Sequence, residues 1–158
     1  MQTIKPCLWF DTQALAAANF YVSIFKNSKL GKVSYYGDGA PLPKGTVLTV
    51  TFQLDGQEFM GLNGGPVFKF TEAVSFVVNC ETQAEIDDYW KKLTANGGQE
   101  VQCGWLKDKF GLSWQIVPTA LGKLMEDKDP AKTNRVMQAL MKMVKLDVNG
   151  LQQAYRGE

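Results

Sequence analysis

The chain has 158 residues, so it fits one domain or two small modules around a shared core. Its residues are 45% hydrophobic and 11% aromatic, which is enough to bury a core and excludes an intrinsically disordered chain. The formal net charge is +1, with lysine and arginine scattered rather than clustered, which argues against nucleic-acid partners and against a polybasic membrane patch.

The first predicted unit begins with a strand over residues 4–10. A helix follows, because apolar residues at spacings of three and four form one face: Leu15, Ala18, Val22 and Phe25. Three further strands are expected at residues 29–36, 46–54 and 58–63. The last two are joined by Asp55-Gly56, a strong hairpin signal.

The same pattern recurs 70 residues later, where Glu81-Thr82-Gln83-Ala84 repeats Asp11-Thr12-Gln13-Ala14. A strand over residues 74–80 precedes the repeat, and Thr82 and Glu85 form a capping-box pattern. The apolar face of the second helix consists of Ile86, Tyr89, Trp90 and Leu93. Strands are expected after it at residues 99–103, 105–107 and 112–117. The chain therefore contains a β-α-β-β-β unit used twice.

The tail from Thr119 has a helical pattern. Asp129-Pro130 is a suitable cap and first helical position. An apolar stripe follows at Val136, Ala139, Leu140, Met143 and Val144, and a last short helix is expected over residues 147–155. We predict an α+β fold with helices on the convex side of a curved, mixed sheet. The expected parts are a first module over residues 1–66, a second over 67–118 and a helical extension over 119–158.

Five stretches spread over roughly residues 4–118 carry a family resemblance: Pro6-Cys7-Leu8-Trp9-Phe10-Asp11, Ala18-Asn19-Phe20-Tyr21, Leu62-Asn63-Gly64-Gly65-Pro66, Asp87-Asp88-Tyr89-Trp90 and Cys103-Gly104-Trp105 through Pro118. With the doubled unit, they make the chain similar to the PhnB-like branch of the vicinal oxygen chelate superfamily. That branch is often labelled "3-demethylubiquinone-9 3-methyltransferase domain", and the superfamily includes glyoxalase I, extradiol dioxygenases and fosfomycin and bleomycin resistance proteins. The resemblance implies two halves of an incomplete barrel, a ligand on the concave sheet face, and a homodimer.

The resemblance also allows a test for a metal site, because metal-dependent members carry ligands on the first and last strands of each copy. The corresponding first-strand positions hold Ile4 and Val74, which donate no electron pair, and Gln115 stands where a glutamate is expected. A lone amide oxygen cannot hold a divalent metal without anionic or imidazole partners, and the chain has no histidine. We expect no metal and no cofactor.

Period-two alternation predicts a small-molecule pocket on the concave face. It assigns Leu8 of the first strand and Phe76 of the fifth to the same face as Gln115, and Trp9 and Trp114 to the helix side. The predicted ligand-binding residues are Ile4, Pro6, Leu8, Asn63, Val74, Phe76, Val78, Trp105, Ser113 and Gln115. The alternative is that the apolar members of this set are core residues.

Three other features favour structural roles. Cys80 and Cys103 are poor nucleophile candidates, because no histidine is present to activate a thiolate. Asp108 is expected to organise the turn before Gly111. The glycine-rich segment 61–65 leads into Pro66 rather than into a helix, so it does not form a usual phosphate loop.

Three hypotheses of function remain open. The first is a metal-independent protein that binds a small aromatic or amphipathic molecule. The second is an enzyme acting on a quinone-like substrate, a methyltransferase by the family label, and the third is a ligand-free structural or regulatory homodimer. We expect a cytoplasmic location, because residues 1–11 lack a secretion-signal pattern, no run of roughly 18 apolar residues is present, and the three distant cysteines form no disulfide framework.

Overall fold

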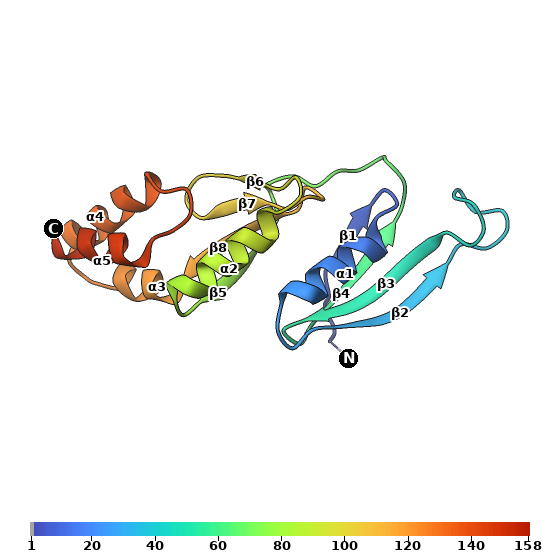
Figure 1. The fold of residues 1–158 in the computed structure, drawn as a ribbon, viewed down its shortest axis with the longest axis horizontal. Helices are drawn as coiled ribbons and strands as arrows, with labels where there is room; N and C mark the ends of the chain where they lie inside the picture. Colours follow the sequence, from blue (N-terminus) through green and yellow to red (C-terminus); the bar gives the residue numbers. More distant parts are fainter. Residues whose placement is uncertain (1) are drawn as a thin grey trace. The chain divides into compact units, whose positions relative to one another are not determined.

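The computed structural model describes residues 2–158, which form two compact units, one ending at Phe70 and the other running from Thr71 to Glu158 (Figure 1). Each unit contains a strand, a helix and three further strands in that order, and three helices follow in the second unit. The α+β class and the duplicated β-α-β-β-β unit are therefore confirmed. Within residues 2–158, no helix has both the length and the apolar character needed to cross a membrane.

The first unit is a four-stranded mixed sheet with one helix. Its elements are β1 (Cys7–Phe10), α1 (Ala14–Ile24), β2 (Lys29–Tyr35), β3 (Val47–Leu54) and β4 (Gln57–Asn63). The strand order is β1-β4-β3-β2, with β1 parallel to β4 and the other pairs antiparallel. The turn at Asp55-Gly56 joins β3 to β4 with φ angles of 49° and 78°, as a type I′ hairpin requires.

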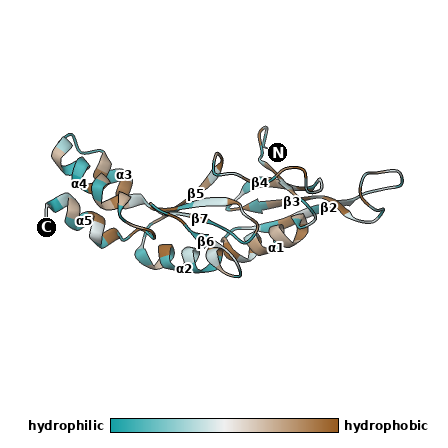
Figure 2. Cartoon of the chain, turned by 90° about the horizontal axis from the view of Figure 1, so that it is seen from above, coloured by the Kyte–Doolittle hydropathy of each residue, from teal (hydrophilic) through white to brown (hydrophobic). Residues whose placement is uncertain are grey.

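One face of this sheet is buried against α1 (Figure 2). Leu8, Gly61 and Val50 lie side by side across three strands, and a Cβ placed on Gly61 would lie 3.2 Å from the Cβ of Ala14. Phe52 and Phe59 are buried on the same face, with ring centroids 5.4 Å apart. Because side chains alternate along a strand, the opposite face, called here the open face, carries Cys7, Trp9, Thr49, Thr51, Met60 and Leu62.

The second unit repeats this topology. Its elements are β5 (Ser75–Cys80), α2 (Gln83–Thr94), β6 (Gln99–Glu100), β7 (Trp105–Lys107) and β8 (Ser113–Pro118), in the order β5-β8-β7-β6. The N-terminus of α2 is capped as predicted, because the Glu85 amide donates to Thr82 Oγ1 at 3.2 Å. The Glu85 carboxylate accepts in return from the Glu81 amide, at 2.7 Å, and so ties down the residue before the cap.

Three helices form the C-terminal extension: α3 (Thr119–Met125), α4 (Pro130–Met141) and α5 (Val148–Arg156). Asp129 caps α4 by accepting from the Ala131 amide at 3.0 Å. Helix α4 ends at Met141, so Met143 and Val144 of the predicted stripe lie beyond it. Their carbonyls instead accept hydrogen bonds from the amides of Cys103 and Gly104, both at 2.8 Å.

The side chain of Gln83 fastens this extension to α2. Its amide nitrogen donates to the Leu146 carbonyl at 3.0 Å, and its carbonyl oxygen accepts from the Val148 amide at 2.8 Å. Lys145 also pairs with Asp87 of α2 at 2.8 Å. The extension therefore belongs to the second unit.

The division between the units falls after Phe70 rather than after residue 66. Two aromatic contacts explain this position. Phe68 packs edge-on against Trp9 at 5.0 Å between ring centroids, and Phe70 packs against Phe10 at 5.3 Å. The segment expected to open the second module thus completes the packing of the first.

Candidate ligand-binding site

Three of the predicted ligand-binding residues lie together on one face of the second sheet. Trp105 and Gln115 are direct neighbours on β7 and β8, and Ser113 lies two positions before Gln115 on the same face. The Gln115 side-chain nitrogen donates to Ser75 Oγ at 2.9 Å. Ser113 is only 1% exposed, and its hydroxyl has no hydrogen-bond partner within residues 2–158.

The face predicted for Phe76 and Val78 is wrong. In the parallel pairing of β5 with β8, Phe76 lies beside Trp114 and Val78 beside Ile116, both of which are buried. The rings of Phe76 and Trp114 are 5.7 Å apart. Ser75 and Val77 share the face of Gln115 instead, because a shift of one residue turns every side chain of a strand over. Val74 precedes β5 and is 62% exposed.

The same correction applies to the first unit. Leu8 is buried on the α1 side, not on the open face, and Trp9 occupies the open face rather than the helix side. Ile4 and Pro6 precede β1, and Ile4 is 85% exposed. Trp9 is held in place by its indole N–H, which donates to the Gly65 carbonyl at 2.9 Å.

Asn63, another predicted ligand residue, is 1% exposed and makes its hydrogen bonds within the fold. Its side-chain oxygen accepts from the Ala14 amide at 2.8 Å, at the first residue of α1. Its side-chain nitrogen donates to the Val47 carbonyl at 3.0 Å, and its own carbonyl accepts from the Tyr36 hydroxyl at 2.6 Å. Asn63 thus joins α1, β3 and β4.

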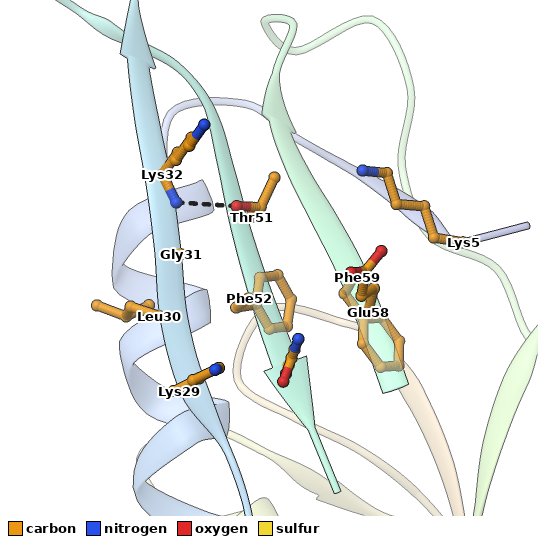
Figure 3. Close-up of a pocket in the computed structure, with 10 residues that line it drawn as sticks. Lys5, Lys29, Leu30, Gly31, Lys32, Thr51, Phe52, Glu58 and Phe59 are labelled. Carbon is orange, nitrogen blue, oxygen red and sulfur yellow. Dashed lines mark hydrogen bonds between the residues drawn. The ribbon is translucent and has the colours of Figure 1, made fainter. Parts of the chain in front are cut away.

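A pocket of about 360 Å³ lies in the first unit, and none of the ten predicted residues lines it, although its Lys5 lies between Ile4 and Pro6 in the chain. Figure 3 shows Lys29 and Lys32 of β2 on one side of it and Lys5, from the segment before β1, on the other. The lining residues are Lys5, Lys29, Leu30, Gly31, Lys32, Thr51, Phe52, Gln53, Glu58 and Phe59. The pocket combines hydrocarbon surface with ammonium, hydroxyl, amide and carboxylate groups.

A β-bulge in β2 shapes this pocket. Leu30 pairs with Phe52 and Val33 with Val50, so Gly31 and Lys32 together lie opposite Thr51. The Lys32 amide donates to Thr51 Oγ1 at 2.9 Å (Figure 3). A Cβ on Gly31 would overlap that oxygen, so the bulge requires glycine here. Glycine inside a strand pattern was the only local signal of the bulge in the sequence.

The side chains present do not fit a metal of the glyoxalase type. Among residues 2–158, no three histidine, cysteine, aspartate or glutamate side chains are grouped so that they could hold a metal ion. With the observed registers, the first and last strands carry mainly thiol, hydroxyl, amide and apolar side chains on the open face of the first sheet and on the Gln115 face of the second, among them Cys7, Ser75 and Gln115. The open face of β4 adds one carboxylate, Glu58, but a single carboxylate without further acidic or imidazole partners does not hold a divalent metal.

Cys80 is fully buried, and burial raises the pKa of its thiol to about 11. We expect an aromatic disulfide reagent at about pH 8 to leave Cys80 unmodified in the folded protein, because the thiolate is the reactive form. The measurement is a count of modified thiols before and after urea unfolding. A Cys80→Ser variant should match the wild type when folded and show one thiol fewer when unfolded. A lower count in the folded variant would contradict this structural role.

With the geometry described, the chain can be compared with known proteins. The model of the family described as 3-demethylubiquinone-9 3-methyltransferase matches residues 2–117. The chain belongs to this family. The PhnB-like assignment that the sequence motifs predicted is confirmed, and the fold is like that of proteins of the vicinal oxygen chelate superfamily. No curated protein matches the chain.

Solved structures agree with this assignment. The PhnB protein of Bacillus cereus is 38% identical, and the match covers 75% of this chain and 100% of that one with a TM-score of 0.68. PA1353 of Pseudomonas aeruginosa is 19% identical over 75% of this chain and 98% of its own, with a TM-score of 0.60. The fosfomycin resistance protein FosX of Listeria monocytogenes, in its monoclinic crystal form, is 16% identical. That match covers 80% of this chain and 98% of FosX, with a TM-score of 0.57. The last two show likeness of fold alone.

Proposed function

We propose that this family member binds a small aromatic or amphipathic molecule, without a metal, on the open face of its first sheet. The observation that carries the proposal is the pocket of about 360 Å³ beside the bulge in β2. Its lining contains polar and charged side chains, and the neighbouring open-face residues Trp9, Met60 and Leu62 are apolar. Such a combination suits a ligand with one polar end and an apolar body.

The second sheet offers a further candidate binding surface. Trp105 supplies a half-buried indole beside Gln115, and the Ser113 hydroxyl is buried without a partner in the described chain. Unsatisfied buried polar groups are rare, so a ligand or water that pairs with Ser113 would stabilise this face. Trp105, Ser113 and Gln115 are therefore proposed ligand contacts.

We also propose a homodimer in the cytoplasm. Large apolar side chains are exposed in both units, among them Phe68 at 63%, Val77 at 53% and Met141 at 64%, and exposed apolar patches often mark interfaces. The free thiols of Cys7, Cys80 and Cys103 suit a reducing compartment. The alternatives remain an enzyme acting on a quinone-like substrate and a dimer without ligand.

A native mass spectrum of freshly purified protein tests these proposals together. We expect two subunits, no transition metal, and added mass from a small organic molecule. A dimer without added mass would favour the ligand-free alternative. Turnover of a quinone-like substrate by the purified protein would favour the enzyme.

The absence of a metal gives a separate prediction. Elemental analysis after dialysis should find far less than one equivalent of zinc, nickel, manganese or iron per subunit, because the donor set is too weak. Replacing Gln115 by glutamate should not change this result, since the residue beside it on β5, Val77, offers no second donor. About one equivalent of metal in the wild type would contradict the proposal.

A further inference from the structure

We propose that the pocket in the first unit holds the anionic end of the ligand, a carboxylate or a phosphate, between Lys29, Lys32 and Lys5. This inference rests on the proposed function and specifies the ligand that the pocket accepts. Three lysines and one glutamate line the pocket, which gives its lining a formal charge of +2. The whole chain carries only +1, so positive charge is concentrated at this place.

The single carboxylate in the lining, Glu58, offsets only one of the three lysine charges. The ammonium groups of Lys44, Lys107 and Lys145 form ion pairs with carboxylates. In the described chain, Lys5, Lys29 and Lys32 form no such pair. A hollow whose lining carries a net positive charge attracts anionic ligands. A carboxylate or phosphate entering it would gain charge-assisted hydrogen bonds that the protein alone does not make.

The bulge brings two of these lysines to the same sheet face. In a regular strand, residues 29 and 32 would point to opposite faces, because they are three positions apart. The extra residue at Gly31 shifts the alternation, so that Lys29, opposite Gln53, and Lys32, opposite Thr51, both line the pocket. Bulges commonly redirect side chains near functional sites. Gly31, which leaves room for Thr51, is therefore part of the anion site.

The apolar part of the same ligand would lie on the neighbouring open face. Met60 is the direct neighbour of Thr51 on β4, and Leu62 and Trp9 follow on β4 and β1. All three are partly exposed. The open face thus changes from cationic at the pocket to apolar beside it, which matches an anionic amphipathic molecule.

Calorimetric titration with matched probes tests the inference. The probes are 2-naphthoate, 2-naphthyl phosphate and the neutral 2-naphthamide, which share one aromatic body. At low salt, we expect the wild type to bind at least one anion about tenfold more tightly than the amide, and added salt should reduce this preference. The double variant Lys29→Gln, Lys32→Gln should lose the preference and still bind the amide.

The control is the double variant Lys26→Gln, Lys44→Gln, which removes the same amount of charge from the first unit outside the pocket. It should keep the preference, and all variants should share one melting temperature. Equal binding of anions and amide by the wild type would overturn the inference and leave the proposed function standing. A preference that survives the pocket variant, or vanishes equally in the control, would also overturn it. If no probe binds, both the inference and the proposed pocket are wrong.

Discussion

Replacing Asp108 by asparagine is expected to destabilise the second unit by about 3 kcal/mol, the scale of lost hydrogen bonds to a buried charged group. Asp108 is 2% exposed. One carboxylate oxygen accepts from the amides of Phe110 and Leu112, at 2.8 and 3.1 Å, and the other accepts from the Trp114 indole N–H at 2.9 Å. Asparagine would present a nitrogen donor to one of these donors, so the turn between β7 and β8 would lose an acceptor.

Urea unfolding followed by tryptophan fluorescence measures this change in the free energy of unfolding. The matched control is Asp88→Asn, since Asp88 is a half-exposed aspartate of α2 paired with Lys92, and exposed pairs contribute about 0–1 kcal/mol. A Trp114→Phe variant should reduce the effect of Asp108→Asn, because the indole partner is then absent. If the Asp108→Asn and Asp88→Asn variants unfold at the same urea concentration, the turn does not depend on the Asp108 carboxylate.

Replacing Leu146 by alanine is expected to lower the free energy of unfolding by about 3 kcal/mol, because the change leaves a cavity and removes buried apolar surface. Leu146 belongs to the loop that connects α4 to α5, and its side chain is fully buried. A Cβ on Gly104 would lie only 2.9 Å from its side chain, so the leucine packs directly on the turn before β7. Its carbonyl also accepts the Gln83 hydrogen bond that fastens the extension to α2.

Thermal unfolding and limited proteolysis test this expectation together. The extension should become easier to cleave in Leu146→Ala, because its packing on the turn is weakened. Gln138→Ala, which changes an exposed polar residue of the same extension, should stay within about 0.5 kcal/mol of the wild type. Rapid cleavage without any loss of stability would mean that the extension contributes little to the second unit.

The elements of the fold could be predicted from local patterns. Helices were marked by apolar residues at three- and four-residue spacing and by caps such as Thr82 and Asp129, and the structure has α2 and α4 at these places. The hairpin at Asp55-Gly56 and the strand Trp105–Lys107 were also found where expected. These features depend on neighbouring residues, so the sequence alone contains them.

The faces of the strands could not be predicted as well. The sheet face on which Leu8 and Phe76 lie depends on which residues of each strand point toward the helix. Period-two alternation is compatible with either of the two faces. The structure resolves this through pairing with distant strands, Gly61 for Leu8 and Trp114 for Phe76. The pocket was missed for a similar reason, since Lys5, Lys29 and Glu58 are far apart in the chain. The segment before β1, the bulged strand β2 and strand β4 bring them together.

The bulge in β2 has a second consequence, for association between chains. β2 is one of the two edge strands of its sheet, with β1 at the other edge, and an edge strand can recruit a foreign strand through its free amides and carbonyls. An irregular backbone at Gly31, flanked by the charges of Lys29 and Lys32, makes this recruitment unfavourable. In the other sheet, the edge strand β6 is only two residues long. Continuous sheet growth and fibril formation through the edges formed by β2 and β6 are therefore disfavoured.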